Sequence, residues 1–305
     1  MYNKFGTPIY GENILYYIIA NETHLKGNGS RKLETVKRVL DVAGKEYEVF
    51  LTHKEGDAKR QAEIITASDE EHTIIAMGGD GTLHDILNGF KNFDKCSLGL
   101  IPFGTGNDFA ATAKIPSDAK RAAEIIAFKA PKAIDFIELS SGLRSINAVG
   151  MGIDVDILKR VYTRKMRGHS KYFRALIPSL ISFKSCNFTL KYDGKEEKHY
   201  GLIAALGNGK QVGGGIKLFP NAEIDDGYLD LLIVDYISRL GMIKAFFKLV
   251  AGKVDEVKNV TFVRTKAATF VHEDENYTLQ AEGELYDNVP LEAHIVEKKL
   301  KFYLP

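Results

Sequence analysis

Short apolar runs alternate with segments of helical spacing over roughly the first 130 residues of the chain. The continuous apolar run at residues 14–20 is typical of a strand buried on both faces of a parallel sheet. Residues 47–52, 72–77 and 97–102 are the further strands that the pattern predicts. The segments between them place apolar residues three or four positions apart, and they occupy residues 30–40, 57–65 and 83–90. Ser30 is the predicted N-cap of the first helix. This alternation predicts βαβ units and a parallel sheet with right-handed connections.

From residue 132 onward the strand patterns follow one another more closely, and several alternate apolar with polar residues as half-buried antiparallel strands do. They occupy residues 132–139, 145–151, 187–193, 200–208, 228–235, 257–265, 268–273, 277–285, 291–298 and 300–305. Helical patterns interrupt them at 153–163, 170–183 and 238–252. We therefore predict an α/β domain over residues 1–131 and a mostly β domain over 132–297. The last strand, 298–305, is expected to return to the first domain.

Composition narrows the class of protein. The 305 residues are 45% hydrophobic, and 41 Lys+Arg against 40 Asp+Glu leave a net charge of +1. Such a chain is neither disordered nor a dedicated duplex-DNA binder, and we expect no nucleic-acid partner. Cys96 and Cys186 are too far apart in the sequence for a zinc ribbon or a disulfide scaffold. No signal peptide and no apolar run of ~18 residues is visible, so we expect a cytoplasmic protein.

A glycine-rich turn, GGDGT at 78–82, directly follows one predicted strand and opens a helix. In open α/β sheets this is where ligands bind. Gly78, Gly79 and Gly81 let the backbone approach a phosphate closely, and helix N–H groups then face the anion. A carboxylate here, Asp80, suits a site in which Mg²⁺ lies between it and the phosphates, or in which it binds the acceptor. The alternative is that GGDGT is only a tight turn between the strand and the helix, without a bound ligand.

A second glycine turn, IPFGTGNDFA at 101–110, follows the next predicted strand. The turn contains Gly104 and Gly106, and its Thr105 and Asn107 side chains can form hydrogen bonds to a ligand. Asp108 is a candidate helix cap or metal ligand. Two such turns on consecutive strand ends predict one ligand-binding cleft.

The pair GGDGT and PFGTGNDFA resembles the diacylglycerol kinase catalytic-domain family, in particular the soluble bacterial diacylglycerol and lipid kinases, which are related to sphingosine and ceramide kinases. The resemblance extends along nearly the whole chain. It implies a Rossmann-like N-terminal domain and a C-terminal β-sandwich domain with a cleft between them, as in NAD kinases and diacylglycerol kinases.

The resemblance also places nucleotide-binding residues before the first glycine turn. Asn21 stands where the family has the Asn of a phosphate loop, and Thr52 with GDA at 56–58 matches the Thr that contacts the nucleotide. The loop 21–30 lacks the family's proline, and Gly27 and Gly29 are the candidate substitutes. An exposed loop without a nucleotide role is the alternative.

The stretch 207–234 ends in DDGYLD and resembles the family's glycine-rich segment, which in bacterial members holds a structural Mg²⁺. The implied ligands are Glu223, Asp226 and the backbone carbonyl of Tyr228. An ordinary Asp-Gly turn is the alternative.

The family's late Asp-Gly-Glu motif stands here as Glu282-Gly283-Glu284. In the bacterial kinases the Asp is thought to be the base that takes the proton of the acceptor hydroxyl. Glu has the same chemistry with one more methylene, and Glu284 matches the family's Glu. The resemblance thus implies Glu282, Glu284 and Asp80 as the catalytic residues.

A basic stretch without any acidic residue separates Asp156 from Asp193. Its cations are Lys159, Arg160, Arg164, Lys165, Arg167, Lys171, Arg174, Lys184 and Lys191. Either this is a solvated helix face, or it contacts an anionic membrane surface. The second reading fits a protein that associates with membranes transiently.

Together these features predict an ATP-dependent lipid kinase that uses Mg²⁺ and phosphorylates a lipid hydroxyl, with diacylglycerol as the favoured acceptor. A kinase for NAD or another small molecule, and a catalytically weakened nucleotide- or lipid-binding relative, are the alternatives. The expected partners are ATP, the lipid and the membrane surface, and the chain is compatible with a homodimer.

Overall fold

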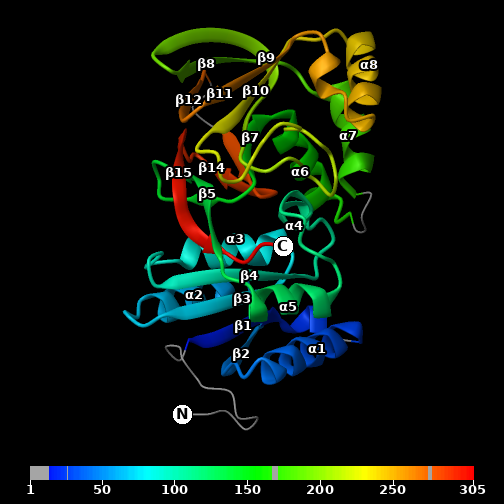
Figure 1. Cartoon of the computed structure of the whole chain (residues 1–305). Coiled ribbons are helices and arrows are strands. Elements are labelled where there is room, and N and C mark those ends of the chain that lie inside the picture. The colour runs from blue at the N-terminus through cyan, green and yellow to red at the C-terminus, as the bar shows by residue number, and fades with distance from the viewer. Residues whose placement is uncertain (1–13, 26, 167–170, 274–276) are drawn as a thin grey trace. The chain divides into compact units, whose positions relative to one another are not determined.

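The computed structural model describes residues 14–25, 27–166, 171–273 and 277–305, and the chain divides into two compact units (Figure 1). The first unit holds the described residues up to Gly104, then Ala113–Ile134 and Lys299–Pro305. The second unit holds Thr105–Thr112 and Asp135–Lys298. The domain limits expected from the sequence stay predictions.

The first unit is built on parallel strands in the order β4-β3-β1-β2, as the sequence pattern predicts. The strands are β1 (Leu15–Asn21), β2 (Tyr47–Thr52), β3 (His72–Gly78) and β4 (Cys96–Pro102). The end of β15 (Leu291–Phe302) pairs with β4 in parallel, Phe302 opposite Leu98. The connecting helices are η1 (Glu22–Leu25), α1 (Asn28–Val42), α2 (Asp57–Thr66), α3 (Asp80–Gly89) and α5 (Ala119–Phe128).

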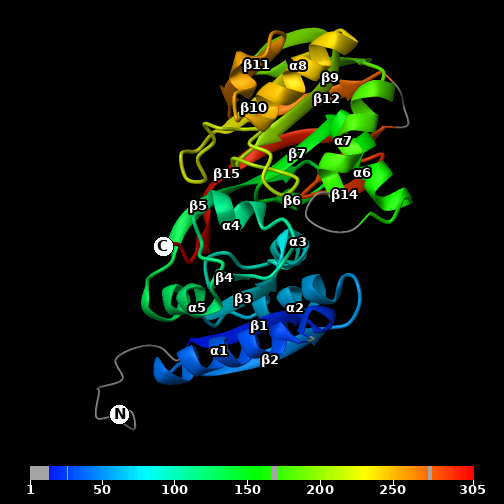
Figure 2. The ribbon, with the colours of Figure 1, turned by 90° about the vertical axis from the view of Figure 1, so that its right-hand side faces the viewer.

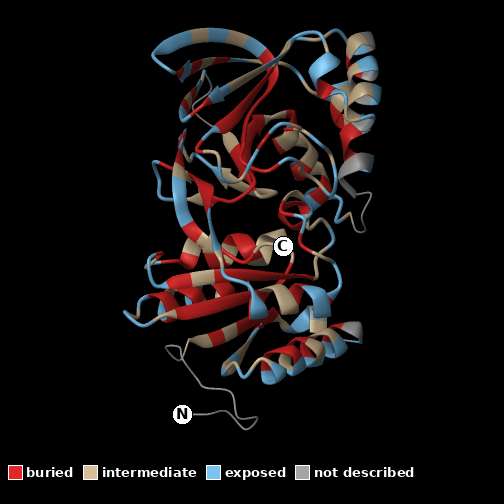
Figure 3. Ribbon diagram, viewed as in Figure 1, coloured by how far each residue is buried: buried red, intermediate tan, exposed pale blue. Residues whose placement is uncertain are grey.

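Burial explains why these segments form strands. Every residue of β3 is buried, and Ile18, Ile74 and Leu98 on neighbouring strands are fully shielded from solvent (Figure 3). Helices α1 and α5 pack together, and so do α2 and α3 (Figure 2). The apolar runs of β3 and β4 are therefore enclosed on both faces of the sheet, whereas β2 at the edge is largely half-buried or exposed.

The start of α1 differs from the prediction. The helix begins at Asn28, with Gly27 at the N-cap in a left-handed conformation (φ 68°). The Ser30 hydroxyl lies inside the first turn and donates to the carbonyl of Gly27 over 3.0 Å. The prediction of Ser30 as N-cap is wrong, because a backbone turn at glycine already starts the helix.

The second unit is mostly antiparallel, in the order β14-β13-β7-β9-β8-β12-β15, with β10 and β11 joined to β9. Its strands are β5 (Lys132–Leu139), β6 (Arg144–Ser145), β7 (Ala148–Gly152), β8 (Cys186–Tyr192), β9 (Lys195–Gly207), β10 (Leu229–Asp235), β11 (Val260–Thr265), β12 (Ala267–His272), β13 (Thr278–Ala281), β14 (Glu284–Asp287) and most of β15. Its helices are α4 (Asp108–Thr112), α6 (Ile153–Thr163), α7 (Lys171–Ser182), α8 (Arg239–Val250) and η2 (Val254–Glu256).

Two hydrophobic clusters fill the second unit. The larger gathers inward-facing residues of most of the antiparallel strands, such as Leu190, Leu206 and Leu231. The smaller gathers Ile153, Phe219 and Leu232. Within the described residues, none of the helices combines the length and the apolar content that crossing a bilayer requires.

An ionisable side chain is buried at the start of α6. Both carboxylate oxygens of Asp154 are shielded from solvent, and a Cβ atom on Gly150 of β7 would lie 2.6 Å from one of them. Burial raises the pKa of Asp154 to about 6, and hydrogen bonding from the Val155 N–H and the Gln280 side chain offsets only part of this rise. Because no contact to either oxygen reaches full hydrogen-bond geometry, the ionised form costs on the order of 3 kcal/mol at neutral pH.

We predict that Asp154→Asn raises the melting temperature at pH 7.5 by more than it does at pH 4.5. The folded-state pKa lies above the unfolded value of 3.8, so wild-type stability falls as the pH rises from about 4 to about 6 and is constant above. The substitution removes this loss, and thermal unfolding at both pH values measures it.

The matched control is Asp156→Asn. Asp156 lies in the same first turn of α6 but is only partly buried and pairs with Arg160 over 2.7 Å. This variant should show no gain at the higher pH, and an equal gain in both variants would trace the effect to the helix terminus rather than to burial.

Candidate active site

The carboxyl ends of the parallel strands bring several predicted residues together within the first unit. Asn21 ends β1 and pairs with Thr52, which ends β2 and is buried. Ala20 pairs with Met77, so Asn21 is also adjacent to Gly78 at the end of β3. The Oδ1 atom of Asn21 accepts a hydrogen bond from the Thr23 N–H over 2.9 Å, which orients the side chain at this edge. These residues occupy the edge at which open parallel sheets bind ligands.

The first glycine turn lies at the same edge. Gly79 caps α3, which begins at Asp80, three residues before the predicted start. A Cβ atom on Gly78 would lie 2.3 Å from the Thr82 hydroxyl, so only glycine lets the first helical turn fold back on the strand. Asp80 and Gly81 are partly exposed at the helix N-terminus, where backbone N–H groups are available for an anion.

The second glycine turn starts beside the first. The Phe103 N–H donates to the Gly78 carbonyl over 2.7 Å, which places Gly104 next along the chain. Thr105, Gly106 and Asn107 belong to the second unit, and Asn107 has a left-handed backbone (φ 53°).

Asp108, which follows this turn, has a role that its sequence position does not reveal. Its buried carboxylate accepts hydrogen bonds from the backbone N–H groups of Gly214 (2.8 Å) and Gly215 (2.9 Å), and from the Gln211 side chain (3.2 Å). Asp108 therefore holds the glycine-rich loop before β10. The run Gly213–Gly215 was the only available signal for this contact.

Glu282 and Gly283 form the two-residue turn between β13 and β14, because Ala281 pairs with Glu284 on either side of them. Both have positive φ, 53° for Glu282 and 83° for Gly283, which is the conformation of a type I′ turn. Glycine, Asn and Asp favour this conformation, whereas for Glu it costs about 1–2 kcal/mol.

Hydrogen bonds hold the Glu282 side chain in place. Its Oε1 atom accepts from the Ser145 hydroxyl and from the backbone N–H groups of Asn147 (2.6 Å) and Ala148 (3.2 Å). The Glu282 N–H in turn donates to the Ala148 carbonyl over 3.2 Å. A carboxylate with several donors on one oxygen has a fixed orientation, as a general base requires.

The rest of the turn is held as well, by residues that sequence reasoning missed. The Gly283 N–H donates to the Gln280 side chain over 3.2 Å, and the Gly283 carbonyl accepts from the Tyr162 hydroxyl over 2.7 Å. Glu284 begins β14, where its carboxylate accepts from the Tyr286 hydroxyl over 3.2 Å. Neither Tyr162 nor Gln280 lies in a recognisable motif.

The predicted structural Mg²⁺ ligands lie on the loop that precedes β10. Asp226 is already bonded on both oxygens: Oδ1 accepts from the Tyr228 N–H over 3.0 Å, and Oδ2 pairs with Arg264. Glu223 is exposed. Among the described residues, no three His, Cys, Asp or Glu side chains gather as a metal site. Arg264 therefore already pairs with Asp226 where the resemblance implies a Mg²⁺ ion, and the implied ligand set stays a prediction.

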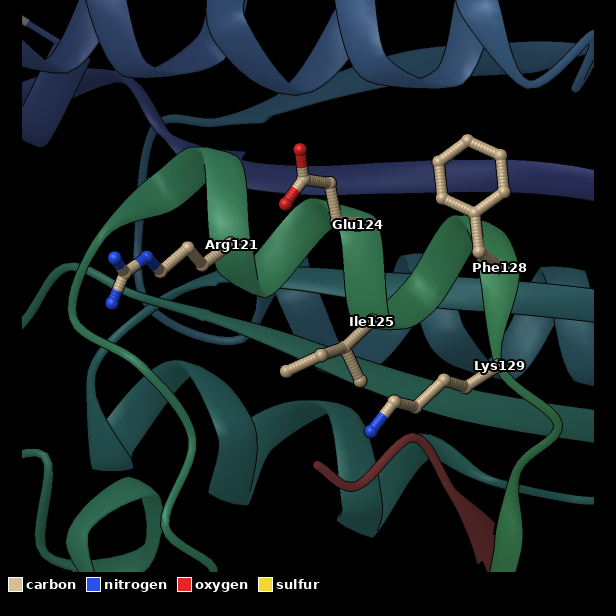
Figure 4. Close-up of a pocket in the computed structure, with 5 residues that line it drawn as sticks. All are labelled: Arg121, Glu124, Ile125, Phe128 and Lys129. Atoms are coloured by element: carbon tan, nitrogen blue, oxygen red, sulfur yellow. The ribbon is translucent and has the colours of Figure 1, made fainter.

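A hollow on α5 is lined by side chains of that helix alone (Figure 4). The lining residues are Arg121, Glu124, Ile125, Phe128 and Lys129. None is a predicted site residue, and a hollow on the outer side of one helix offers no convergent polar groups for a ligand.

Comparison with known proteins identifies the family of the chain. The model of the diacylglycerol kinase catalytic domain matches residues 16–139, and that of the YegS C-terminal NAD kinase beta sandwich-like domain matches residues 147–304. A YegS-like lipid kinase of Xanthomonas campestris is 32% identical over 298 residues, covering 92% of this chain and 94% of that protein. A diacylglycerol kinase of Staphylococcus aureus is 29% identical, covering 94% of this chain and 91% of that protein.

Solved structures share the fold. A diacylglycerol kinase from Bacillus anthracis aligns with a TM-score of 0.79 at 21% identity, covering 96% of this chain and 97% of that one. An NAD kinase from Archaeoglobus fulgidus in complex with ATP aligns with a TM-score of 0.51 at 13% identity, covering 95% and 93%. The predicted fold class is thereby confirmed. With these matches along nearly its whole length, the chain belongs to the diacylglycerol kinase catalytic-domain family, a family of phosphotransferases.

Proposed function

We propose that the protein transfers the γ-phosphoryl group of ATP to the hydroxyl of a lipid, with diacylglycerol as the acceptor and phosphatidic acid as the product. The observation that carries this proposal is the glycine turn at Gly78–Thr82, which opens α3 at the carboxyl edge of the parallel sheet with Asn21 and Thr52 beside it. The relatives named diacylglycerol kinase support the choice of acceptor.

In the proposed reaction the first unit holds the nucleotide. Backbone N–H groups at the start of α3 bind phosphate oxygens, and Gly78, Gly79 and Gly81 leave room for the approach. Thr105, Gly106 and Asn107, with Gly104, are proposed to contact the nucleotide as well. Asp80 is a partly exposed carboxylate, a ligand type that suits Mg²⁺, and it would hold the ion that neutralises the phosphate charge when ATP is bound.

The second unit supplies the base. The Glu282 carboxylate takes the proton of the lipid hydroxyl, the hydroxyl oxygen bonds to the γ-phosphorus, and the bond to the β–γ bridging oxygen breaks to release ADP. Ser145, Asn147 and Ala148 keep the carboxylate oriented during the transfer. Glu284, on the adjacent strand residue, is proposed to assist.

A kinase for NAD or another soluble acceptor is the second candidate, because an NAD kinase shares the fold. Radiolabelled ATP supplied with diacylglycerol, sphingosine, ceramide and NAD in parallel separates the candidates. Label in phosphatidic acid supports the proposal, label in NADP supports the alternative, and label in none supports a catalytically weakened relative.

The surface around α6, α7 and α8 favours a peripheral contact with anionic membranes. Arg164 and Lys165 are exposed after α6, and the structure gives them no ion pair within the residues it describes. Ile181 of α7 and Phe247 of α8 expose 63% and 66% of their surface. Cations and exposed apolar side chains on helices that pack against one another suit an anionic lipid interface. Arg167, part of the same predicted basic stretch, lies outside the described residues.

Asp80→Asn should lower turnover at least about a hundredfold, because an amide neither holds Mg²⁺ as a carboxylate does nor neutralises its charge. The melting temperature should change little, since Asp80 is partly exposed. Asp85→Asn, further along α3 and away from the glycine turn, is the matched control. A near-normal rate for Asp80→Asn would remove this residue from the mechanism.

Glu282→Gln should abolish turnover while ATP binding persists, because the amide cannot take a proton but its oxygen can still accept from Ser145, Asn147 and Ala148. Glu282→Asp should relieve the backbone of the type I′ turn but draw the carboxylate back from Ser145, Asn147 and Ala148. It should lose rate because the carboxylate is one methylene shorter.

Initial rates, ATP titration and thermal unfolding of both variants test this. A rate increase in Glu282→Asp would instead identify the wild type as a weakened kinase. Full activity of Glu282→Gln on every acceptor would place the base elsewhere, with Asp80 next to be considered.

Charge reversal at Arg164 and Lys165 should reduce binding to anionic vesicles and make activity on vesicle-borne lipid less sensitive to salt. Activity on a short-chain, water-soluble acceptor should be kept. Reversal of the exposed Lys114 and Lys129 in the first unit gives the same change in net charge and is the control. Equal vesicle binding by the two variants would show that the α6 cations form an ordinary solvated surface.

A further inference from the structure

The loop at residues 223–228, here called the acidic loop, concentrates negative charge. It carries Glu223, Asp225 and Asp226, and Asp230 follows on β10. Asp230 is buried, whereas Glu223 and Asp225 are exposed. The partly buried Asp226 carboxylate is stabilised by a cation, and the identity of that cation decides whether the loop depends on a metal ion.

Arg264 of β11 is in place as this cation. Its guanidinium pairs with Asp226 Oδ2, and its strand position lies opposite Asp230 in the β10–β11 ladder. The guanidinium also lies over the Tyr228 ring, 4.6 Å from the ring centre. A planar guanidinium is suited both to a carboxylate and to an aromatic face, so these contacts reinforce one another.

The backbone of the acidic loop is held by a buried side chain from β5, Asp135. Both oxygens of the buried Asp135 accept backbone hydrogen bonds, from the Gly227 N–H over 2.7 Å and from the Lys298 N–H over 2.6 Å. The Asp135 N–H donates to the Ile224 carbonyl over 2.7 Å. A divalent ion that binds the Oδ2 atom of Asp226 would have to displace Arg264, which already pairs with that atom.

We propose that Arg264 is the built-in counter-cation of the acidic loop and takes the place of the structural Mg²⁺ that the resemblance to bacterial kinases implies. The second unit then keeps its fold without a divalent ion. This proposal concerns the stability of the loop, and it stands or falls independently of the proposed lipid kinase activity.

The test is thermal unfolding of the full chain, without nucleotide, in EDTA and in increasing MgCl₂. The wild-type melting temperature should show no rise with Mg²⁺ that depends on Asp226. Arg264→Gln should melt a few degrees lower in EDTA and regain part of the loss as Mg²⁺ is added, because the vacated carboxylates then bind the ion. Adding Asp226→Asn to this variant should remove the Mg²⁺ response.

Lys266→Gln is the matched control. Lys266 lies 5.5 Å from the same Tyr228 ring but pairs with Glu297 rather than Asp226. This variant should show no response to Mg²⁺. A response of Lys266→Gln equal to that of Arg264→Gln would overturn the specific role of Arg264.

Even if Arg264→Gln does not fold, the change of the wild-type melting temperature with Mg²⁺ tests the proposal. A saturable rise of the wild-type melting temperature with Mg²⁺ that Asp226→Asn abolishes would overturn the proposal, as would an Arg264→Gln protein that folds but gains nothing from Mg²⁺. A rise that Asp226→Asn leaves intact arises at another site and supports the assignment of Arg264.

Discussion

A buried carboxylate, Asp135, joins the parts of the second unit that lie far apart in the sequence. It is fully shielded from solvent at the point where β5 enters this unit. It connects β5 to the acidic loop through Gly227 and to β15 through Lys298. Burial raises its pKa, and the two backbone hydrogen bonds oppose this rise. Without this residue, the N–H groups of Gly227 and Lys298 would lose their acceptor, and the loss at the buried Gly227 costs about 1–3 kcal/mol.

Asp108 and Glu282 make the same kind of contact as Asp135. Each carboxylate accepts hydrogen bonds from two backbone N–H groups, of Gly214 and Gly215 in one case and of the chain at residues 147–148 in the other. In all three places an acidic side chain holds the backbone of a segment that is distant in the sequence. A motif rich in acidic residues and glycine therefore indicates two different things, a ligand site or a backbone anchor. Only the direction of the side chain distinguishes them.

The regular elements could be predicted from the sequence, because their patterns reflect local burial. The strand expected at 47–52 has those bounds in the structure, and the helix expected at 170–183 extends over Lys171–Ser182. Residues 291–298 and 300–305 were predicted as two strands, whereas β15 continues through Lys298 with a local left-handed backbone (φ 46°). Such a kink changes the pattern of side chains without breaking the strand.

Contacts between distant segments could not be predicted. The pairing of Arg264 with Asp226 joins residues 38 positions apart, and nothing in either local pattern indicates it. The motifs did identify the edge formed by Asn21, Thr52 and Gly78, because parallel strands must end together. They did not identify Tyr162 or Gln280, which act through single hydrogen bonds to Gly283.

The turn at Glu282 shows why an unfavourable residue can persist. A glutamate with φ 53° is strained, and replacing it by Asp would relieve the backbone. Asp, however, would draw the carboxylate back from Ser145 and the N–H groups of residues 147–148, which now surround Oε1. The extra methylene of Glu lets the carboxylate reach these donors, although the backbone of the turn is strained. The surrounding hydrogen bonds hold Glu282 in this strained conformation. Strain that is held in this way is typical of functional sites.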